Sequence, residues 1–236
     1  MRALITLVAT VAFVLAPQVT PDFSGYNPGM FPVEIPRPSV QPAGYAFAIW
    51  GVIFTWLLVY AGMGMIRRTP EWDLPRLPYV ASVLIGSVWL AVASSAPITA
   101  TVLILMMGAC TFAAFLMASP SQSRWLIQAP LALYAGWLTA ACSVSLGVIL
   151  AGYGILSDTA SALTMLAVVL VTAIAMQRLR PTMPVYSVAV IWAALGIVQV
   201  NWQPNPTVAW AALGGAALLT AAALILALQA RNRPLA

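Results

Sequence analysis

PAGYAFAIWGVIFTWLLVYAGMGMIRR, residues 42–68, decides what kind of fold this chain can adopt. Residues 43–66 carry no charge. At about 1.5 Å of rise per residue, a helix of that length crosses a hydrocarbon core of roughly 30 Å. Pro42 suits the entry of a helix, because the first turn does not need its missing N–H. Arg67 and Arg68 follow the apolar run, so the stretch predicts a membrane-spanning helix that ends in the cytoplasm.

The composition of the whole chain requires lipid as its solvent. Hydrophobic residues make up 62% of the 236 residues, charged residues only 6%, and the mean hydropathy is +0.96. A soluble domain of this length could not bury so much apolar surface. The net charge of +5 comes from arginines between apolar runs, with no lysine, so it indicates membrane topology and not nucleic-acid binding. We predict one all-α, polytopic transmembrane helical bundle in the lipid bilayer.

Eight apolar stretches are long enough to be membrane spans. They are residues 2–16, 43–66, 78–95, 98–118, 126–153, 159–177, 185–201 and 207–229. The first, residues 1–16, is interpreted as a transmembrane helix or signal anchor; if it is a cleaved signal, seven spans remain. Seven prolines make residues 17–42 an external loop, which either lies across the mouth of the bundle or forms a disordered linker. The bundle itself is assigned to residues 43–230 and a cytoplasmic tail to residues 231–236.

The arginines predict the orientation of the spans. If the amino terminus lies inside and there are eight spans, every arginine except Arg37 falls on the inner side. Short external turns then lack positive charge, as the positive-inside rule requires. Both termini are therefore expected in the cytoplasm.

Apart from Arg2 at the start of the first, the predicted spans contain no Asp, Glu, Lys, Arg or His. Intramembrane ionisable groups are typical of proton relays, so their absence argues against a proton-coupled transporter. It also leaves no base for a serine or cysteine nucleophile. With no histidine and two cysteines, a zinc, haem or iron–sulfur centre is disfavoured. We expect no catalytic residue, no metal and no required cofactor.

Tryptophans are the remaining candidates for a functional site. Five of the nine lie well inside predicted spans, away from their ends, namely Trp50, Trp56, Trp89, Trp137 and Trp192. A buried indole N–H needs an acceptor, so such residues indicate either core packing or a pocket for a flat, apolar ligand. Phe47, Trp50 and Phe54 recur at helical spacing and form one aromatic stripe. Trp72 is interpreted as an interfacial residue. Small residues, Gly62 with Gly64 and Gly214 with Gly215, predict close helix contacts in the bundle or the seam of a homodimer.

Two stretches resemble a known family. Residues 42–54 carry Pro42, Gly44, Tyr45, Phe47 and Trp50, and residues 130–141 carry Tyr134 and Trp137. They are similar to two helices of the tryptophan-rich sensory protein (TspO/MBR) family, which is related to the mitochondrial translocator protein. The resemblance is to longer bacterial members with spans beyond the five-helix core. This chain departs from the family where Ser143 and Ser145 replace asparagines, which affects the ligand more than the fold.

The resemblance implies a TspO-like core in a bacterial inner membrane, a pocket for a tetrapyrrole or sterol-like ligand, and often a dimer. Without histidine, a porphyrin would be held by stacking. The hypothesis is a membrane receptor or sensor for a planar hydrophobic molecule. Its alternatives are a transporter or permease for a small apolar metabolite and a porphyrin-modifying membrane enzyme. The predicted ligand-binding residues are Tyr45, Phe47, Trp50, Phe54, Tyr134 and Trp137.

Overall fold

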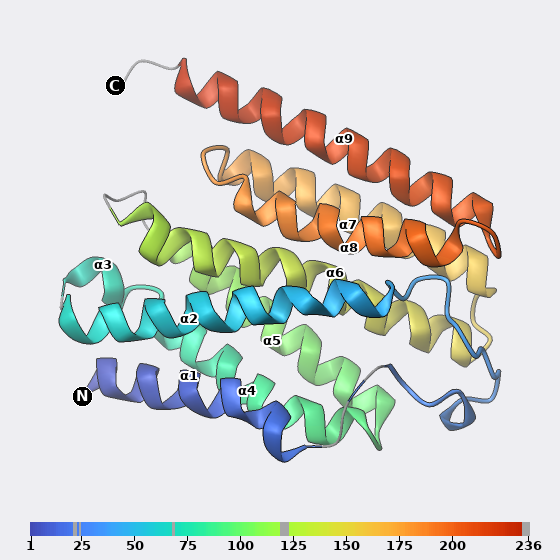
Figure 1. Ribbon diagram of the computed structural model, residues 1–236, viewed down its shortest axis with the longest axis horizontal. Coiled ribbons are helices and arrows are strands. Elements are labelled where there is room, and N and C mark those ends of the chain that lie inside the picture. Colours follow the sequence, from blue (N-terminus) through green and yellow to red (C-terminus); the bar gives the residue numbers. More distant parts are fainter. Residues whose placement is uncertain (21–22, 24, 68, 119–122, 233–236) are drawn as a thin grey trace.

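The computed structural model describes residues 1–20, 23, 25–67, 69–118 and 123–232, and all regular structure in this part of the chain is helical (Figure 1). The long helices are α1 (Arg2–Val19), α2 (Ile49–Ile66), α4 (Arg76–Ala93), α5 (Pro97–Met117), α6 (Ala129–Gly152), α7 (Asp158–Leu179), α8 (Val185–Asn201) and α9 (Pro206–Arg231). The short elements are η1 (Pro28–Met30), η2 (Gly44–Ala48), α3 (Pro70–Asp73) and η3 (Arg124–Gln128), a π-helical turn.

The eight long helices correspond one to one with the predicted spans. Among the described residues, seven helical segments are long and apolar enough to cross a membrane. The eighth, α8, is also apolar but has 17 residues, which makes it shorter than the other seven. The predicted all-α transmembrane bundle is therefore confirmed.

Helix α6 is the central element of the bundle. In the span that contains α6, 67% of the residues in an apolar 18-residue stretch are buried. In the other long spans, the buried share of such a stretch lies between 22% and 44%. Helices α1, α4 and α5 lie on one side of α6, and α7, α8 and α9 lie on the other (Figure 1). Gly136 permits the closest crossing, because a Cβ there would lie 2.2 Å from the carbonyl oxygen of Tyr186 on α8. Side chains on most faces of α6 therefore point at protein and not at lipid.

The span expected at residues 43–66 begins with a tighter turn. Residues Gly44–Ala48 form the 3₁₀ segment η2, and the α-helix begins at Ile49. The Ala43 N–H donates to the Gly196 carbonyl at 3.1 Å, and Gly196 would have no room for a Cβ beside Pro42 and Ala46. This contact with α8 fixes the entry of α2 and hence the position of its aromatic side chains.

The described part of the proline-rich loop is packed on one end of the bundle. The backbone N–H of Ser39 donates to Asp158 Oδ1 at 2.9 Å, and Asn201 Nδ2 donates to the Ser39 carbonyl at 2.8 Å. Farther along, the Phe31 ring occupies the space that a Cβ at Gly152 would need. The loop therefore contacts α6, α7 and α8 and covers the ends of these helices.

The opposite end of the bundle gathers the positive charge. The amino terminus, α3 and the carboxyl end of α9 lie at this end (Figure 1). The helix ends and turns found there carry Arg2, Arg67, Arg76, Arg124, Arg178, Arg180 and Arg231. Arg37 belongs to the loop at the other end, and Arg68 and Arg233 lie outside the described residues. We call these two ends the arginine end and the loop end.

Two smaller predictions need correction. Trp72 is only 1% exposed and stacks on Tyr60, with ring centroids 5.3 Å apart, so it is not an interfacial side chain. The second correction concerns the four glycines predicted to make close helix contacts. Within the described part of the bundle, only Gly64 makes such a contact, against the Trp72 ring. A Cβ on any of Gly62, Gly214 or Gly215 would have no atom within 4 Å. The contacts predicted for those three within the bundle are therefore absent.

Candidate functional site

A cavity of about 270 Å³, the main lobe, lies between α1, α2, α4, α5 and α6. A smaller lobe of about 70 Å³, the side lobe, extends under the loop. The two share the side chains of Phe23, Phe47, Trp89, Ile104, Trp137 and Ala141. The remaining walls of the main lobe are Phe13, Ala16, Pro17, Trp50, Phe54, Gly86, Leu90, Met107 and Leu138.

Four of the six predicted site residues line this cavity. Phe47, Trp50 and Phe54 come from η2 and α2, and Trp137 comes from α6. The Trp137 ring centroid lies 5.8 Å from that of Phe47 and 6.2 Å from that of Trp50, with interplanar angles of 80° in both pairs. Edge-to-face pairs at these distances are favourable for aromatic rings. The aromatic stripe and the later tryptophan therefore meet, although about 90 residues separate them in the chain.

The other two predicted site residues lie elsewhere. Tyr45 is 44% exposed and packs edge-on against Trp192, with ring centroids 5.4 Å apart. Tyr134 is fully buried behind the cavity, where its hydroxyl contacts Ser82 Oγ at 3.1 Å. Its ring lies 6.2 Å from that of Trp50, so Tyr134 supports the wall without lining it.

Three aromatic residues of the wall were not predicted. Phe13 of α1 inserts between helices, with ring centroids 5.3 Å from Phe54 and 5.9 Å from Trp50. Phe23 packs edge-on against Trp89, with ring centroids 5.2 Å apart, and lines both lobes. Of these, Trp89 alone carried a sequence signal, as one of the tryptophans within a span.

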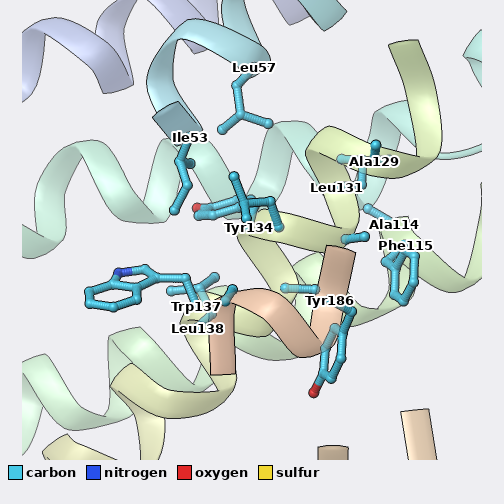
Figure 2. Packing of buried hydrophobic residues seen from close by; sticks show 14 of the residues in the cluster. Ile53, Leu57, Ala114, Phe115, Ala129, Leu131, Tyr134, Trp137, Leu138 and Tyr186 are labelled. Carbon is cyan, nitrogen blue, oxygen red and sulfur yellow. The ribbon is translucent and has the colours of Figure 1, made fainter. Parts of the chain in front are cut away.

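Hydrogen bonding distinguishes Trp137 from three of the other four indoles within the spans. Trp56, Trp89 and Trp192 each donate their Nε1–H to a backbone carbonyl, at 2.8–2.9 Å. Trp137 is 3% exposed, and its Nε1 has no hydrogen-bond partner among the described residues. Figure 2 shows its ring extending away from the other labelled side chains of the core. An unpaired buried N–H of this kind costs about 1–3 kcal/mol.

The side lobe has the only polar edge of the described cavity wall. The Tyr26 hydroxyl lies 2.8 Å from Ser145 Oγ, which lies 2.8 Å from Thr101 Oγ1. Thr101 donates to the Pro97 carbonyl at 2.9 Å, so the chain of donors runs from Tyr26 through Ser145 to Thr101. Tyr26 and Ser145 line the side lobe, and their donors are used within the protein. These two hydroxyl groups therefore offer oxygen lone pairs to a ligand, beside Gln41, which also lines the side lobe.

The described cavity walls carry no Asp, Glu, Lys, Arg or His. Within the described residues, no three His, Cys, Asp or Glu side chains come together as metal ligands would. Recognition in this cavity would depend on ring contacts, shape and single hydrogen bonds.

The helices and this cavity define a polytopic α-helical membrane protein with an uncharged, aromatic-lined cavity between its helices. The chain belongs to the TSPO-like protein family, whose family model matches residues 2–225. The match begins in α1 and ends in α9, so the likeness extends well beyond five helices. No curated protein and no solved structure matches the chain.

Proposed function

We propose that this protein is a membrane receptor that binds a planar, mostly apolar molecule between α1, α2, α4, α5 and α6. The observation that carries the proposal is the main lobe itself, which is lined by apolar and aromatic side chains and in whose wall Trp50 and Trp137 meet edge-to-face. A concave, aromatic-lined pocket of this kind is typical of a site for a small apolar ligand.

The geometry of the rings favours a flat ligand. Trp50 and Trp137 present faces and edges to the same cavity, and Phe54 lies 5.1 Å from Trp50 in a tilted arrangement. A planar molecule makes the most contact with such surfaces, because aromatic pairs gain both from burial and from offset or edge-to-face geometry.

We propose binding and not catalysis as the activity of the site. General acid–base or nucleophilic catalysis needs a titrating group near the ligand, and the walls of the main lobe contain only apolar and aromatic side chains. We further propose that the protein resides in a bacterial inner membrane with its arginine end in the cytoplasm, since positive residues concentrate on that side. The cavity would then lie nearer the external loop.

Ligand binding can be tested by filling the cavity. Ala141 lines both lobes, so Ala141→Phe places a ring in the space between them. In detergent micelles, a panel of flat apolar probes of increasing size would be titrated against intrinsic tryptophan fluorescence. At least one probe should quench saturably, and Ala141→Phe should weaken its binding by roughly tenfold or more, which corresponds to about 1.4 kcal/mol.

Ala221→Phe is the matched control, because Ala221 lies on an exposed face of α9. It adds the same ring to the surface and should leave quenching unchanged. If every probe quenches both variants and the unmodified protein to the same extent, the fluorescence change reports partition into the micelle, and the proposed site is refuted.

A further inference from the structure

Two arginines at the arginine end connect the turn between α7 and α8 to the neighbouring segments. Arg124, the first residue of η3, donates from Nη2 to the Thr182 carbonyl in that turn. Arg180, two residues before Thr182, donates from Nη2 to the Leu116 carbonyl in the last turn of α5. Both hydrogen bonds are exposed at the surface. A single turn therefore carries one of these arginines and binds the other.

A buried polar network holds this turn in place. The Met183 N–H donates to the Arg180 carbonyl at 3.0 Å. Gln177 is 1% exposed, and its Nε2 donates to the carbonyls of Arg180 and Pro181 at 3.2 and 3.3 Å. Ser187 Oγ on α8 donates in turn to Gln177 Oε1 at 2.6 Å. A buried network of this kind fixes the backbone that it binds, so Arg180 extends from a rigid turn.

The positive charge at this turn lacks a carboxylate partner. Among the described residues, the one salt bridge joins Arg76 to Asp73, at α3 and the start of α4. Arg178, exposed in the last turn of α7, adds another cation two residues before Arg180. Partial burial lowers the pKa of the Arg180 guanidinium, because the cation loses water without gaining a carboxylate. A bound anion would supply the missing countercharge.

The two arginines lie at the depth of the lipid headgroups. The apolar span that contains α6 begins at Arg124, and the span of α7 ends at Leu179, one residue before Arg180. Trp125 is 59% exposed, and the Arg124 guanidinium lies 5.4 Å from the centre of its ring. Tryptophan and arginine side chains both favour the boundary between hydrocarbon and headgroups. The anion closest to hand at this level is the phosphate of a phospholipid.

We infer that Arg124 and Arg180 form a binding site for the phosphate of an anionic phospholipid. A guanidinium presents five N–H donors in a planar fork that matches phosphate oxygens, and the carbonyl contact of each arginine occupies one of them. Basic sites between helices on the cytoplasmic side of membrane proteins bind anionic headgroups. This site goes beyond the proposed receptor function and does not depend on the cavity.

Native mass spectrometry of the full chain in a mild detergent tests the site with two lipids. Phosphatidylglycerol and phosphatidylcholine with identical acyl chains would be titrated. The anionic lipid should bind about 25-fold more tightly, or roughly fivefold for each arginine. Arg124→Gln combined with Arg180→Gln should remove this preference. Arg2→Gln combined with Arg231→Gln removes the same charge from exposed positions of α1 and α9 and should retain most of it.

Three results would overturn the inference. The first is equal binding of the two lipids to the unmodified protein, which is decisive whether or not the variants fold. The second is a preference that survives substitution of Arg124 and Arg180, or that both pairs of substitutions reduce equally. The third is displacement of phosphatidylglycerol by inorganic phosphate at the same concentration, since the site would then bind the free anion. None of these results affects the receptor proposal, because the Ala141→Phe titrations report on the cavity.

Discussion

Adding one methyl group at Gly86 should loosen α1 from the wall of the cavity. A Cβ at Gly86 would lie 2.4 Å from Phe13 Cε2 and 2.9 Å from Met107 Cε. Carbon atoms in favourable contact are about 3.5–4.0 Å apart, so the overlap with Phe13 exceeds about 1 Å. Overpacking of this kind costs about 1–3 kcal/mol. Gly86→Ala should therefore lower the free energy of unfolding by about 2 kcal/mol.

A compensating substitution tests whether Phe13 is the cause. Phe13→Leu removes the ring atoms that the new methyl group meets, at the cost of its contacts with Trp50 and Phe54. The double variant should be more stable than the sum of the single effects predicts, with a coupling free energy of about 1–2 kcal/mol. Such coupling identifies a direct contact between α1 and α4.

Unfolding would be followed by circular dichroism as the mole fraction of sodium dodecyl sulfate in mixed micelles rises. Gly62→Ala is the matched control, because a Cβ there meets no atom within 4 Å. It should be neutral or slightly stabilising, by at most about 1 kcal/mol from helix propensity. Equal destabilisation by Gly86→Ala and Gly62→Ala, or additive effects of Gly86→Ala and Phe13→Leu, would refute the packing of Phe13 against Gly86.

Three further predictions concern the loop, the outer helices and the orientation. Asp158→Asn weakens the anchor of the Ser39 backbone and hydroxyl, so cleavage of the loop by a protease should accelerate by roughly tenfold. Glu34→Gln makes the same change at an exposed position of the loop and should leave the cleavage rate unchanged. Gly214→Leu fills an open groove of about 320 Å³ between α7, α8 and α9. If this groove is a homodimer seam, the dimer fraction measured by native mass spectrometry should fall at least severalfold, and an unchanged dimer fraction excludes the seam. The orientation can be tested in a variant without native cysteines by adding a membrane-impermeant maleimide to intact cells. The reagent should label Ile155→Cys at the loop end and not Leu74→Cys at the arginine end, and the reverse pattern would invert the proposed orientation.

The helices were predictable because lipid imposes a simple rule on sequence. A spanning segment must be long, apolar and helical, and charged residues must mark its ends. The predicted span at residues 207–229 and the observed α9 (Pro206–Arg231) differ by only a few residues. The start of α2 was less accurate, because the 3₁₀ turn at Gly44–Ala48 depends on the contact of Ala43 with Gly196, more than 150 residues away.

The candidate site was only partly predictable. Phe47, Trp50 and Phe54 share one face of a helix, a periodicity that is visible in the sequence. Tyr45 shares the motif but turns toward Trp192, and whether a side chain near the start of a helix faces the core depends on the preceding turn. Phe13 was missed because α1 is short and was open to interpretation as a cleaved signal. Its contact with Gly86 is a property of two helices and not of either sequence segment.

The packing of α1 shows how this cavity can be closed within lipid. Lipid tails are as apolar as leucine, so burying apolar surface does little to hold one helix against another, and close packing and hydrogen bonds must supply the free energy. Helix α1 has both, since Phe13 fits the space left by Gly86 and Thr10 pairs with the Tyr79 hydroxyl at 2.8 Å. Thr10 also donates to the Thr6 carbonyl, so Tyr79 is the donor in that pair. The wall that α1 gives the main lobe therefore depends on a few specific contacts, and the glycine at position 86 is as much a part of the site as the rings that line it.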